Sequence, residues 1–145
     1  MSFFQSIISL YYNYFTFKGR ATRSEYWWAN LFYQFAYSIL LWIDLVLEIY
    51  YLSGLFAAMT FFPLISVTVR RLHDVSRSGG WFWINLVPLF GIIYFLYLLM
   101  KKGTPEENAY GKYNDYKSKW ILIIYIIFTV IWASVMIIFN NPFII

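Results

Sequence analysis

The sequence contains no cysteine and few charged residues. Asp, Glu, Lys and Arg make up 12% of its 145 residues, whereas they supply about 25% of a typical soluble domain. Without cysteine, disulfides and thiolate chemistry are excluded, and the sequence does not indicate the redox compartment. The shortage of charge argues against an ordinary soluble domain, because such a domain has to cover its surface with polar side chains.

Apolar and aromatic side chains take the place of the missing charge. Hydrophobic residues make up 61% of the chain and aromatic residues 25%, a composition that excludes intrinsic disorder. Lipid is the solvent that accepts such a surface, so we expect one all-α domain, an integral membrane helical bundle. The chain has 11 basic residues and a net charge of +4. In a membrane protein such residues indicate topology, and we expect no nucleic-acid partner.

The first 17 residues are apolar and aromatic but are interrupted by polar side chains. They lack a basic region and a small-residue cleavage site, so we expect them to remain in the mature protein. The run is short for a span, and its tyrosines favour the headgroup level of a bilayer. We therefore predict an amphipathic helix over residues 3–17 that lies on the membrane, with a packed N-terminal arm as the alternative.

Four longer apolar segments follow. The first begins where Thr22 and Glu25 have the spacing of a capping box, in which each side chain bonds the backbone amide of the other residue. Length and hydropathy predict helices over about residues 23–50, 52–70, 81–100 and 120–139. The polar stretch 101–119 separates the last two, and Thr104 followed by Pro105 predicts the start of a short helix there.

The third apolar segment, residues 81–100, allows two topologies. An uncharged run of 20 residues usually spans the bilayer, which gives four straight spans. Pro88 and Gly91 near its centre instead allow a re-entrant hairpin that turns and comes back. Four straight spans place six Lys and Arg residues inside and five outside, whereas the hairpin places all eleven inside, as the positive-inside rule favours. Both versions put the N-terminus in the cytoplasm, and the side of the C-terminus stays open.

The most distinctive charged cluster follows the second apolar segment. Four of its members have the helical spacing i, i+3, i+4 and i+7 and so share one face: Arg70, His73, Asp74 and Arg77. We predict that Asp74 pairs with both Arg70 and Arg77. Arginine forks at a membrane surface are typical of a site that binds a phosphate or a carboxylate. The alternative is a stop-transfer cluster whose members only satisfy one another.

A second charged cluster precedes the first predicted span and contains Arg20, Arg23 and Glu25. In either topology it lies on the same side of the membrane as Arg70, Arg71 and Arg77. Basic groups at this surface attract anionic lipid headgroups, at about 1 kcal/mol each. The same groups also serve simply to fix the topology, which is the alternative interpretation.

The sequence offers little for cofactor chemistry or catalysis. With one His and no Cys we expect no metal, and we expect no other cofactor because no phosphate loop or nucleophile elbow occurs. The neighbouring His73 and Asp74 leave one enzymatic alternative, an acid–base pair that acts on lipid phosphates. Asp44, near the far end of the first span, is interpreted as a boundary charge that Lys101 would neutralise if all spans are straight.

Three motifs occur in order along the chain. They are residues 19–27 (GRATRSEYW), residues 70–79 (with RRLHD and RSG) and residues 103–111 (GTPEENAYG). Together they resemble the bacterial YhaH/YhaI-type inner-membrane family, known as domain of unknown function 805. The resemblance implies a small helical protein of the bacterial inner membrane, with a family-like domain over residues 1–111. It also adds Asn108, in the third motif, to the candidate binding residues.

The leading hypothesis is a non-enzymatic membrane protein whose surface site binds an anionic lipid headgroup or a small solute, with transport as one use of such a site. Its candidate binding residues are Arg20, Arg23, Glu25, Arg70, Arg71, His73, Asp74, Arg77 and Asn108. Small residues in the second span predict self-association into a homo-oligomer. The alternative is a regulatory or scaffolding subunit that docks a partner protein through residues 101–119. Residues 112–145, a polar linker and the fourth span, lie beyond the resemblance.

Overall fold

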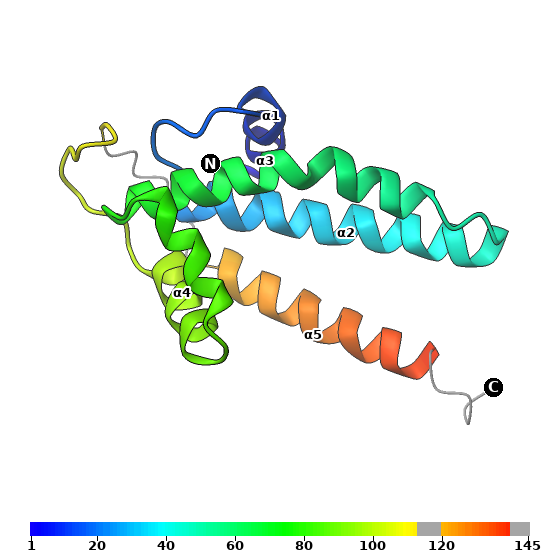
Figure 1. The fold of residues 1–145 in the computed structure, drawn as a ribbon. Coiled ribbons are helices and arrows are strands. Elements are labelled where there is room, and N and C mark those ends of the chain that lie inside the picture. Colours follow the sequence, from blue (N-terminus) through cyan, green and yellow to red (C-terminus); the bar gives the residue numbers. More distant parts are fainter. Residues whose placement is uncertain (113–119, 140–145) are drawn as a thin grey trace.

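The computed structural model describes residues 1–112 and 120–139, and in these ranges the chain is helical with no strand. Its elements, in chain order, are α1 (Phe3–Tyr12), α2 (Arg23–Leu47), α3 (Leu52–Asp74), the 3-10 helix η1 (Gly79–Leu86), α4 (Phe90–Met100) and α5 (Ile121–Phe139). The long helix α2 packs against both α3 and α5 (Figure 1). The all-α prediction is confirmed for the part of the chain that the structure describes.

α2 and α3 form an antiparallel hairpin, and among the described residues they are the two helices long and apolar enough to cross a bilayer. α2 ends where Glu48 takes a left-handed conformation, with φ 56°. The Asp44 carboxylate, which is 1% exposed, accepts hydrogen bonds from the amides of Leu52 and Ser53 at 3.0 and 2.8 Å. Asp44 therefore caps the start of α3, and Lys101, which lies beside Arg71 at the opposite end of that helix, does not neutralise it.

α1 packs across α2 and α3 and is shorter than predicted. It starts at a capping box built on Ser2 and ends at Tyr12, so the predicted helix over 3–17 extends too far. The Ser66 hydroxyl of α3 lies 2.8 Å from the Asn13 carbonyl, which ties down the chain just after the helix. The outer face of α1 is apolar and exposed at Phe4, Ile8 and Tyr12. Its place on the membrane surface stays a prediction.

Residues 79–100 form two short helices that pack against each other. η1 and α4 are separated by a break at Pro88, after which Leu89 takes a φ of 60°. A Cβ at Gly91 would lie 2.0 Å from the Ile84 carbonyl oxygen, so the close approach of α4 to η1 requires glycine. The straight helix that one of the two topologies predicts is therefore not formed.

The η1–α4 hairpin starts and finishes at the same end of α3. The amide of Thr104, just after α4, donates to the Asp74 carbonyl at 3.0 Å. Arg71, in the last turn of α3, donates to the Leu99 carbonyl at 3.0 Å. α4 therefore brings the chain back to the point where α3 ends (Figure 1).

The loop after α4 is irregular. The short helix predicted after Thr104 is absent, and residues 101–112 form turns in its place. Asn108 and Gly111 pair through two backbone hydrogen bonds of 3.0 and 3.2 Å. The rest of the predicted polar stretch, residues 113–119, lies outside the described residues.

α5 forms where the fourth apolar segment is predicted, and it runs beside α2 (Figure 1). The Thr129 hydroxyl lies 3.1 Å from Gln34 Oε1, and the ring centroids of Trp27 and Tyr125 are 4.8 Å apart. These contacts attach α5 to one side of α2. Whether α5 crosses the membrane, and whether the protein self-associates, stay predictions.

Candidate functional site

The three sequence motifs meet at one end of the α2–α3 hairpin. The amide of Ala21, in the first motif, donates to the Arg70 carbonyl at 2.9 Å. The amide of Thr104, in the third motif, donates to the Asp74 carbonyl at 3.0 Å. These bonds join the first and third motifs to the second. We call the resulting polar cluster the motif junction, and its members are Arg20, Glu25, Arg70, Arg71, His73, Asp74 and Asn108.

Arg20 lies at the centre of the motif junction. Its Nε donates to Asp74 Oδ1 at 3.0 Å. Its two Nη groups donate to backbone carbonyls of the third motif, at 2.6 Å to Thr104, 2.9 Å to Glu106 and 3.2 Å to Gly111. Irregular loops have carbonyls without backbone partners, and a buried guanidinium satisfies several of them at once. Arg20, whose side chain is 2% exposed, thereby fixes the third motif on the end of α3.

Arg71 joins α3 to the end of α4. Its Nε donates to the Leu99 carbonyl at 3.0 Å, its Nη2 to the Lys101 carbonyl and its Nη1 to Asp74 Oδ2. The side chain is fully buried, at 0% exposure. The last carbonyls of a helix have no helical partner and carry partial negative charge, so a cation is favourable there. Arg71 thus holds the hairpin of η1 and α4 against α3.

The prediction that Asp74 pairs with Arg70 and Arg77 is wrong. Its carboxylate pairs instead with Arg20 and Arg71. Spacing within one helix predicts contacts only between residues three or four positions apart. It therefore gives no information about Arg20, which lies 54 residues away in the sequence. Arg71 is three residues from Asp74 on the same helix and is the nearer partner.

Arg70 and Glu25 form a second buried ion pair. Arg70 Nη1 and the Ser9 hydroxyl both donate to Glu25 Oε1, at 2.7 and 2.8 Å. Only half of the predicted capping box is present, because the Thr22 hydroxyl accepts from the Glu25 amide at 3.2 Å while the Glu25 carboxylate binds Arg70. The Arg70 side chain is 5% exposed, yet its Nε and Nη2 have no hydrogen-bond partner among the described residues.

His73 and Asn108 hold the third motif against the end of α3. The His73 ring stacks on Tyr110 with centroids 3.8 Å apart, and its Nδ1 lies 3.1 Å from the Gly19 carbonyl. Asn108 Nδ2 donates to the His73 carbonyl at 3.0 Å. In the ranges that the structure covers, no hydrogen bond joins His73 to Asp74, so the geometry gives the enzymatic alternative no support.

Two predicted site residues lie outside the motif junction. Arg77 is exposed, and its guanidinium carbon is 4.9 Å from the centroid of the Trp81 ring. Arg23 is exposed at the first position of α2. Across residues 1–112 and 120–139, no group of three His, Cys, Asp or Glu side chains could hold a metal ion.

The predicted site residues do not include Ser9, Gly103 and Tyr110, although all three contact side chains of the junction. A Cβ at Gly103 would lie 2.2 Å from Asp74 Oδ2, so glycine lets the loop touch this carboxylate. Gly103 and Tyr110 belong to the third motif, which therefore contained a signal for both. Ser9 has no such signal, because nothing in the sequence distinguishes it from the other hydroxyls of α1.

The chain has relatives that share these motifs. A family model described as "Protein of unknown function (DUF805)" matches residues 14–112. Inner membrane protein YhaI of Escherichia coli (strain K12) is 40% identical over 115 residues, which cover 78% of this chain and 96% of YhaI. Inner membrane protein YhaH of the same strain is 33% identical over 108 residues, which cover 68% of this chain and 87% of YhaH. No solved structure matches the chain.

The matched residues contain all three motifs and every predicted site residue, whereas α5 lies beyond them. The resemblance found in the sequence is thereby confirmed. The chain belongs to the DUF805 family, whose members YhaI and YhaH are inner membrane proteins and whose function is unknown.

Proposed function

We propose that this protein is a non-enzymatic, multi-pass inner-membrane protein that binds the phosphate of an anionic phospholipid through Arg70 at the motif junction. The open hydrogen-bond donors of Arg70 carry this proposal. Its Nε and Nη2 are buried and have no partner among the described residues, while Glu25 pairs with Nη1 alone. Buried polar groups are costly unless they are hydrogen-bonded, so an acceptor is expected at these two groups.

Among the described residues, the buried donors of the junction that lack a hydrogen-bond partner belong to Arg70. Its Nε–H and Nη2–H lie along one edge of the guanidinium plane, and such an edge binds two oxygens of a phosphate. Glu25 holds the opposite side of the group through Nη1 at 2.7 Å, which orients the open edge. Because the side chain is 5% exposed, a neighbouring side chain has to move aside before a headgroup can bind.

The distribution of charge supports a cytoplasmic location for the junction and the N-terminus. The described basic residues lie at the junction end of the α2–α3 hairpin, and Asp44 and Glu48 lie at the opposite end. The η1–α4 hairpin returns Lys101 and Lys102 to the junction end, as the positive-inside rule favours. In this topology η1 and α4 form a re-entrant segment that packs against α3, with Phe95, Leu98 and Leu99 of α4 buried and its tip at Leu89 and Phe90 exposed.

The docking alternative has less support than lipid binding. A partner that used the loop after α4 would compete for loop carbonyls already bound by Arg20 and for the Asn108 side chain, which binds the His73 carbonyl. A free phosphate offers the same chemistry as a headgroup, so the experiment has to separate these two sources.

Lipid retention by the purified full-length chain tests the proposal. The protein in detergent is incubated with equal amounts of phosphatidylglycerol and phosphatidylcholine, and native mass spectrometry identifies the lipid that stays bound. Two hydrogen bonds from a charged donor favour phosphatidylglycerol by about tenfold or more. Equal retention of the two lipids would contradict the proposal, and inorganic phosphate that binds without lipid would indicate a small-anion site.

The matched variants are Glu25→Gln/Arg70→Gln and Arg77→Gln. The double variant removes both charges of the pair, so it leaves no unpaired buried charge that would unfold the protein. We expect it to lose the preference for phosphatidylglycerol. Arg77→Gln removes an exposed arginine outside the junction and is expected to keep the preference. A preference that survives in the double variant would exclude Arg70 as the site.

A further inference from the structure

The hairpin formed by η1 and α4 has an exposed apolar tip. Four large side chains at this tip are between 66% and 82% exposed: Trp83, Leu86, Leu89 and Phe90. The buried side chains of α4 come from Phe95 onwards, toward the end where the helix meets α3. A contiguous exposed apolar surface marks a site of contact with a partner or with lipid.

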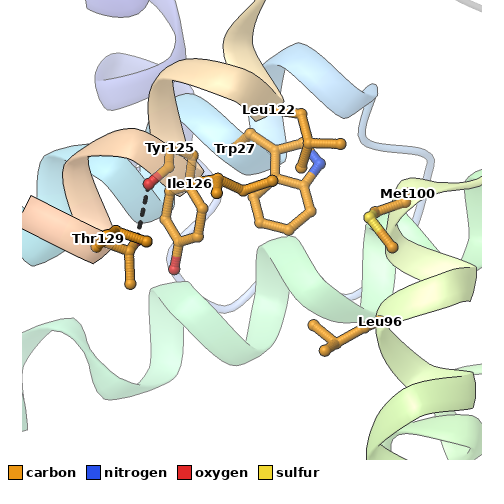
Figure 2. A pocket seen from close by; sticks show the side chains of 8 residues that line it. Trp27, Leu96, Met100, Leu122, Tyr125, Ile126 and Thr129 are labelled. Atoms are coloured by element: carbon orange, nitrogen blue, oxygen red, sulfur yellow. Dashed lines mark hydrogen bonds between the residues drawn. The ribbon is translucent and has the colours of Figure 1, made fainter. Parts of the chain in front are cut away.

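The hairpin stands apart from α5. A pocket of about 280 Å³ separates the two, with Leu96 and Met100 of α4 on one wall and Tyr125 and Ile126 of α5 on another (Figure 2). α3 holds the hairpin at its base, where Arg71 donates to a carbonyl at the end of α4 and where η1 packs against the helix. The tip therefore projects away from the other described helices.

The hairpin lies across the direction of the two long helices. At its base, a Cβ on Gly79 would lie 2.8 Å from Val69 Cγ1, so the chain turns close against α3. From there η1 and α4 project sideways from the end of α3 (Figure 1). The 11 residues of α4 form a helix about 16 Å long, half of the roughly 30 Å hydrocarbon core, so an upright hairpin would reach the centre of the bilayer. The sideways hairpin instead keeps its tip near the level of the motif junction.

Positive charge flanks both ends of the hairpin. Arg77 precedes η1, Lys101 and Lys102 follow α4, and all three residues are exposed. Between Asp74 and Glu106 the sequence contains no acidic residue. A second copy of the hairpin would bring the same positive charges, whereas an anionic lipid surface complements them. Apolar side chains combined with basic ones are typical of a segment that lies in the membrane interface.

We propose that the η1–α4 hairpin is a shallow anchor in the anionic cytoplasmic leaflet. Its apolar tip enters the upper part of the acyl chains, and its basic residues lie among the headgroups. The anchor rests on the cytoplasmic location of the motif junction under the proposed function, but it does not depend on lipid binding at Arg70.

Fluorescence quenching measures the depth of the tip. The natural chain has no cysteine, so Phe90→Cys and Phe35→Cys each give one site for a bimane label. Phe35 lies near the middle of α2 and is 52% exposed, which makes it the reference for the bilayer centre. The labelled chains are reconstituted in vesicles of phosphatidylcholine and phosphatidylglycerol. These vesicles contain lipids with a nitroxide at the headgroup, at the top of the acyl chain or at its end.

The two positions are expected to differ. The label at Phe90→Cys should be quenched most by the nitroxide at the top of the chain, and the label at Phe35→Cys by the nitroxide at its end. Leu86→Cys gives a second position at the tip and should match Phe90→Cys. Strongest quenching of the tip by the chain-end nitroxide would overturn the shallow anchor. Weak quenching of the tip by every lipid would overturn it as well, because another protein would then cover the tip.

The choice of lipid tests the role of charge. With the nitroxide at the top of the chain, spin-labelled phosphatidylglycerol is expected to quench Phe90→Cys about two- to fivefold more than spin-labelled phosphatidylcholine. Lys101→Gln/Lys102→Gln removes two exposed charges and should reduce this excess. Equal quenching by the two lipids in the chain with both lysines, or an excess that the lysine variant leaves unchanged, would contradict an electrostatic anchor.

Glu25→Gln/Arg70→Gln separates the anchor from the lipid site of the proposed function. In the Phe90→Cys chain this double variant is expected to keep the excess of quenching by phosphatidylglycerol, because the hairpin retains its own charges. Loss of the excess in this variant would assign the nearby lipid to the Arg70 site and overturn the anchor. Retention of the excess, together with a lost lipid preference in native mass spectrometry, would support both assignments independently.

Discussion

The two ends of the α2–α3 hairpin bury charge in different ways. At the turn, the Asp44 carboxylate accepts two amide hydrogen bonds and one hydroxyl hydrogen bond from the start of α3. The helix N-terminus supplies the donors and a favourable dipole, so no cation is needed. At the motif junction, arginines and carboxylates form buried ion pairs, and the Nε and Nη2 of Arg70 have no hydrogen-bond partner among the described residues.

Burial of a charge is therefore not by itself a sign of function. Asp44 is as buried as the carboxylates of the junction, but the first turn of α3 satisfies it. The motif junction differs because its bonds join three distant segments and still leave two hydrogen-bond donors of Arg70 without a partner among the described residues. A ligand is expected at the end of the hairpin where the pairing is incomplete.

The largest expected effect concerns the side of the membrane on which each end lies. The natural chain has no cysteine, so Glu48→Cys and Glu107→Cys each introduce a single thiol. With a membrane-impermeant maleimide on intact cells, we expect Glu48→Cys to be labelled fully and Glu107→Cys only after lysis. The cysteine-free parent is the control. Labelling of both variants in intact cells would contradict the proposed cytoplasmic location of the junction.

Next in size is the loss of Arg71. Arg71→Ala leaves Asp74 without one partner and the last carbonyls of α4 unpaired, which should lower the free energy of unfolding by about 3–5 kcal/mol. Denaturant unfolding of the reconstituted protein, followed by tryptophan fluorescence, measures the loss. Arg77→Ala, at an exposed arginine six residues further on, serves as the control and should change little. Similar losses in both variants would show that the buried contacts of Arg71 do not stabilise the fold.

Substitutions of two glycines test the difference between the two ends of the α2–α3 hairpin. A Cβ at Gly103 would meet Asp74 Oδ2 at 2.2 Å, and two arginines hold that carboxylate in place. Gly103→Ala is therefore expected to cost about 1–3 kcal/mol of stability. Gly54, near the other end of α3, has no atom within 4 Å of its added Cβ, so Gly54→Ala should stabilise the helix by about 0.5–1 kcal/mol. The same unfolding measurement would refute this difference if both changes had the same sign.

The smallest effect is expected at the turn. Asp44→Ala removes the cap of α3 and should lower the free energy of unfolding by about 1 kcal/mol, as for other N-terminal caps. It should leave the preference for phosphatidylglycerol intact, because Asp44 lies at the end of the hairpin away from Arg70. A lost lipid preference in this variant would mean that the two ends are coupled.

Local features of the sequence located the helices more reliably than the pairing of their side chains. The start of α2 follows from Thr22, whose hydroxyl caps the helix as predicted. The partners of Asp74 could not be predicted in the same way, because Arg20 reaches it from another segment of the chain. The three motifs indicated which segments matter, and tertiary folding decided which of their charges meet.

The third apolar segment shows the same limit. Pro88 and Gly91 marked a break in the sequence, but local rules could not decide whether the chain would continue or return. The bond from Arg71 to the Leu99 carbonyl, which joins residues 28 positions apart, helps to hold the returning segment against α3. Hydropathy cannot predict a contact between residues so far apart, because it describes one segment of the sequence at a time.

The contacts of Arg20 also affect the order in which the chain folds during synthesis. Its partner Gly111 follows it by 91 residues, and a ribosome that adds about 5–20 residues per second needs seconds to reach it. When Gly111 is made, α2 and α3 are already complete, and until then the guanidinium of Arg20 lacks the carbonyls of the third motif. The end of the molecule at which α2 begins is thus locked only after both long helices have been made.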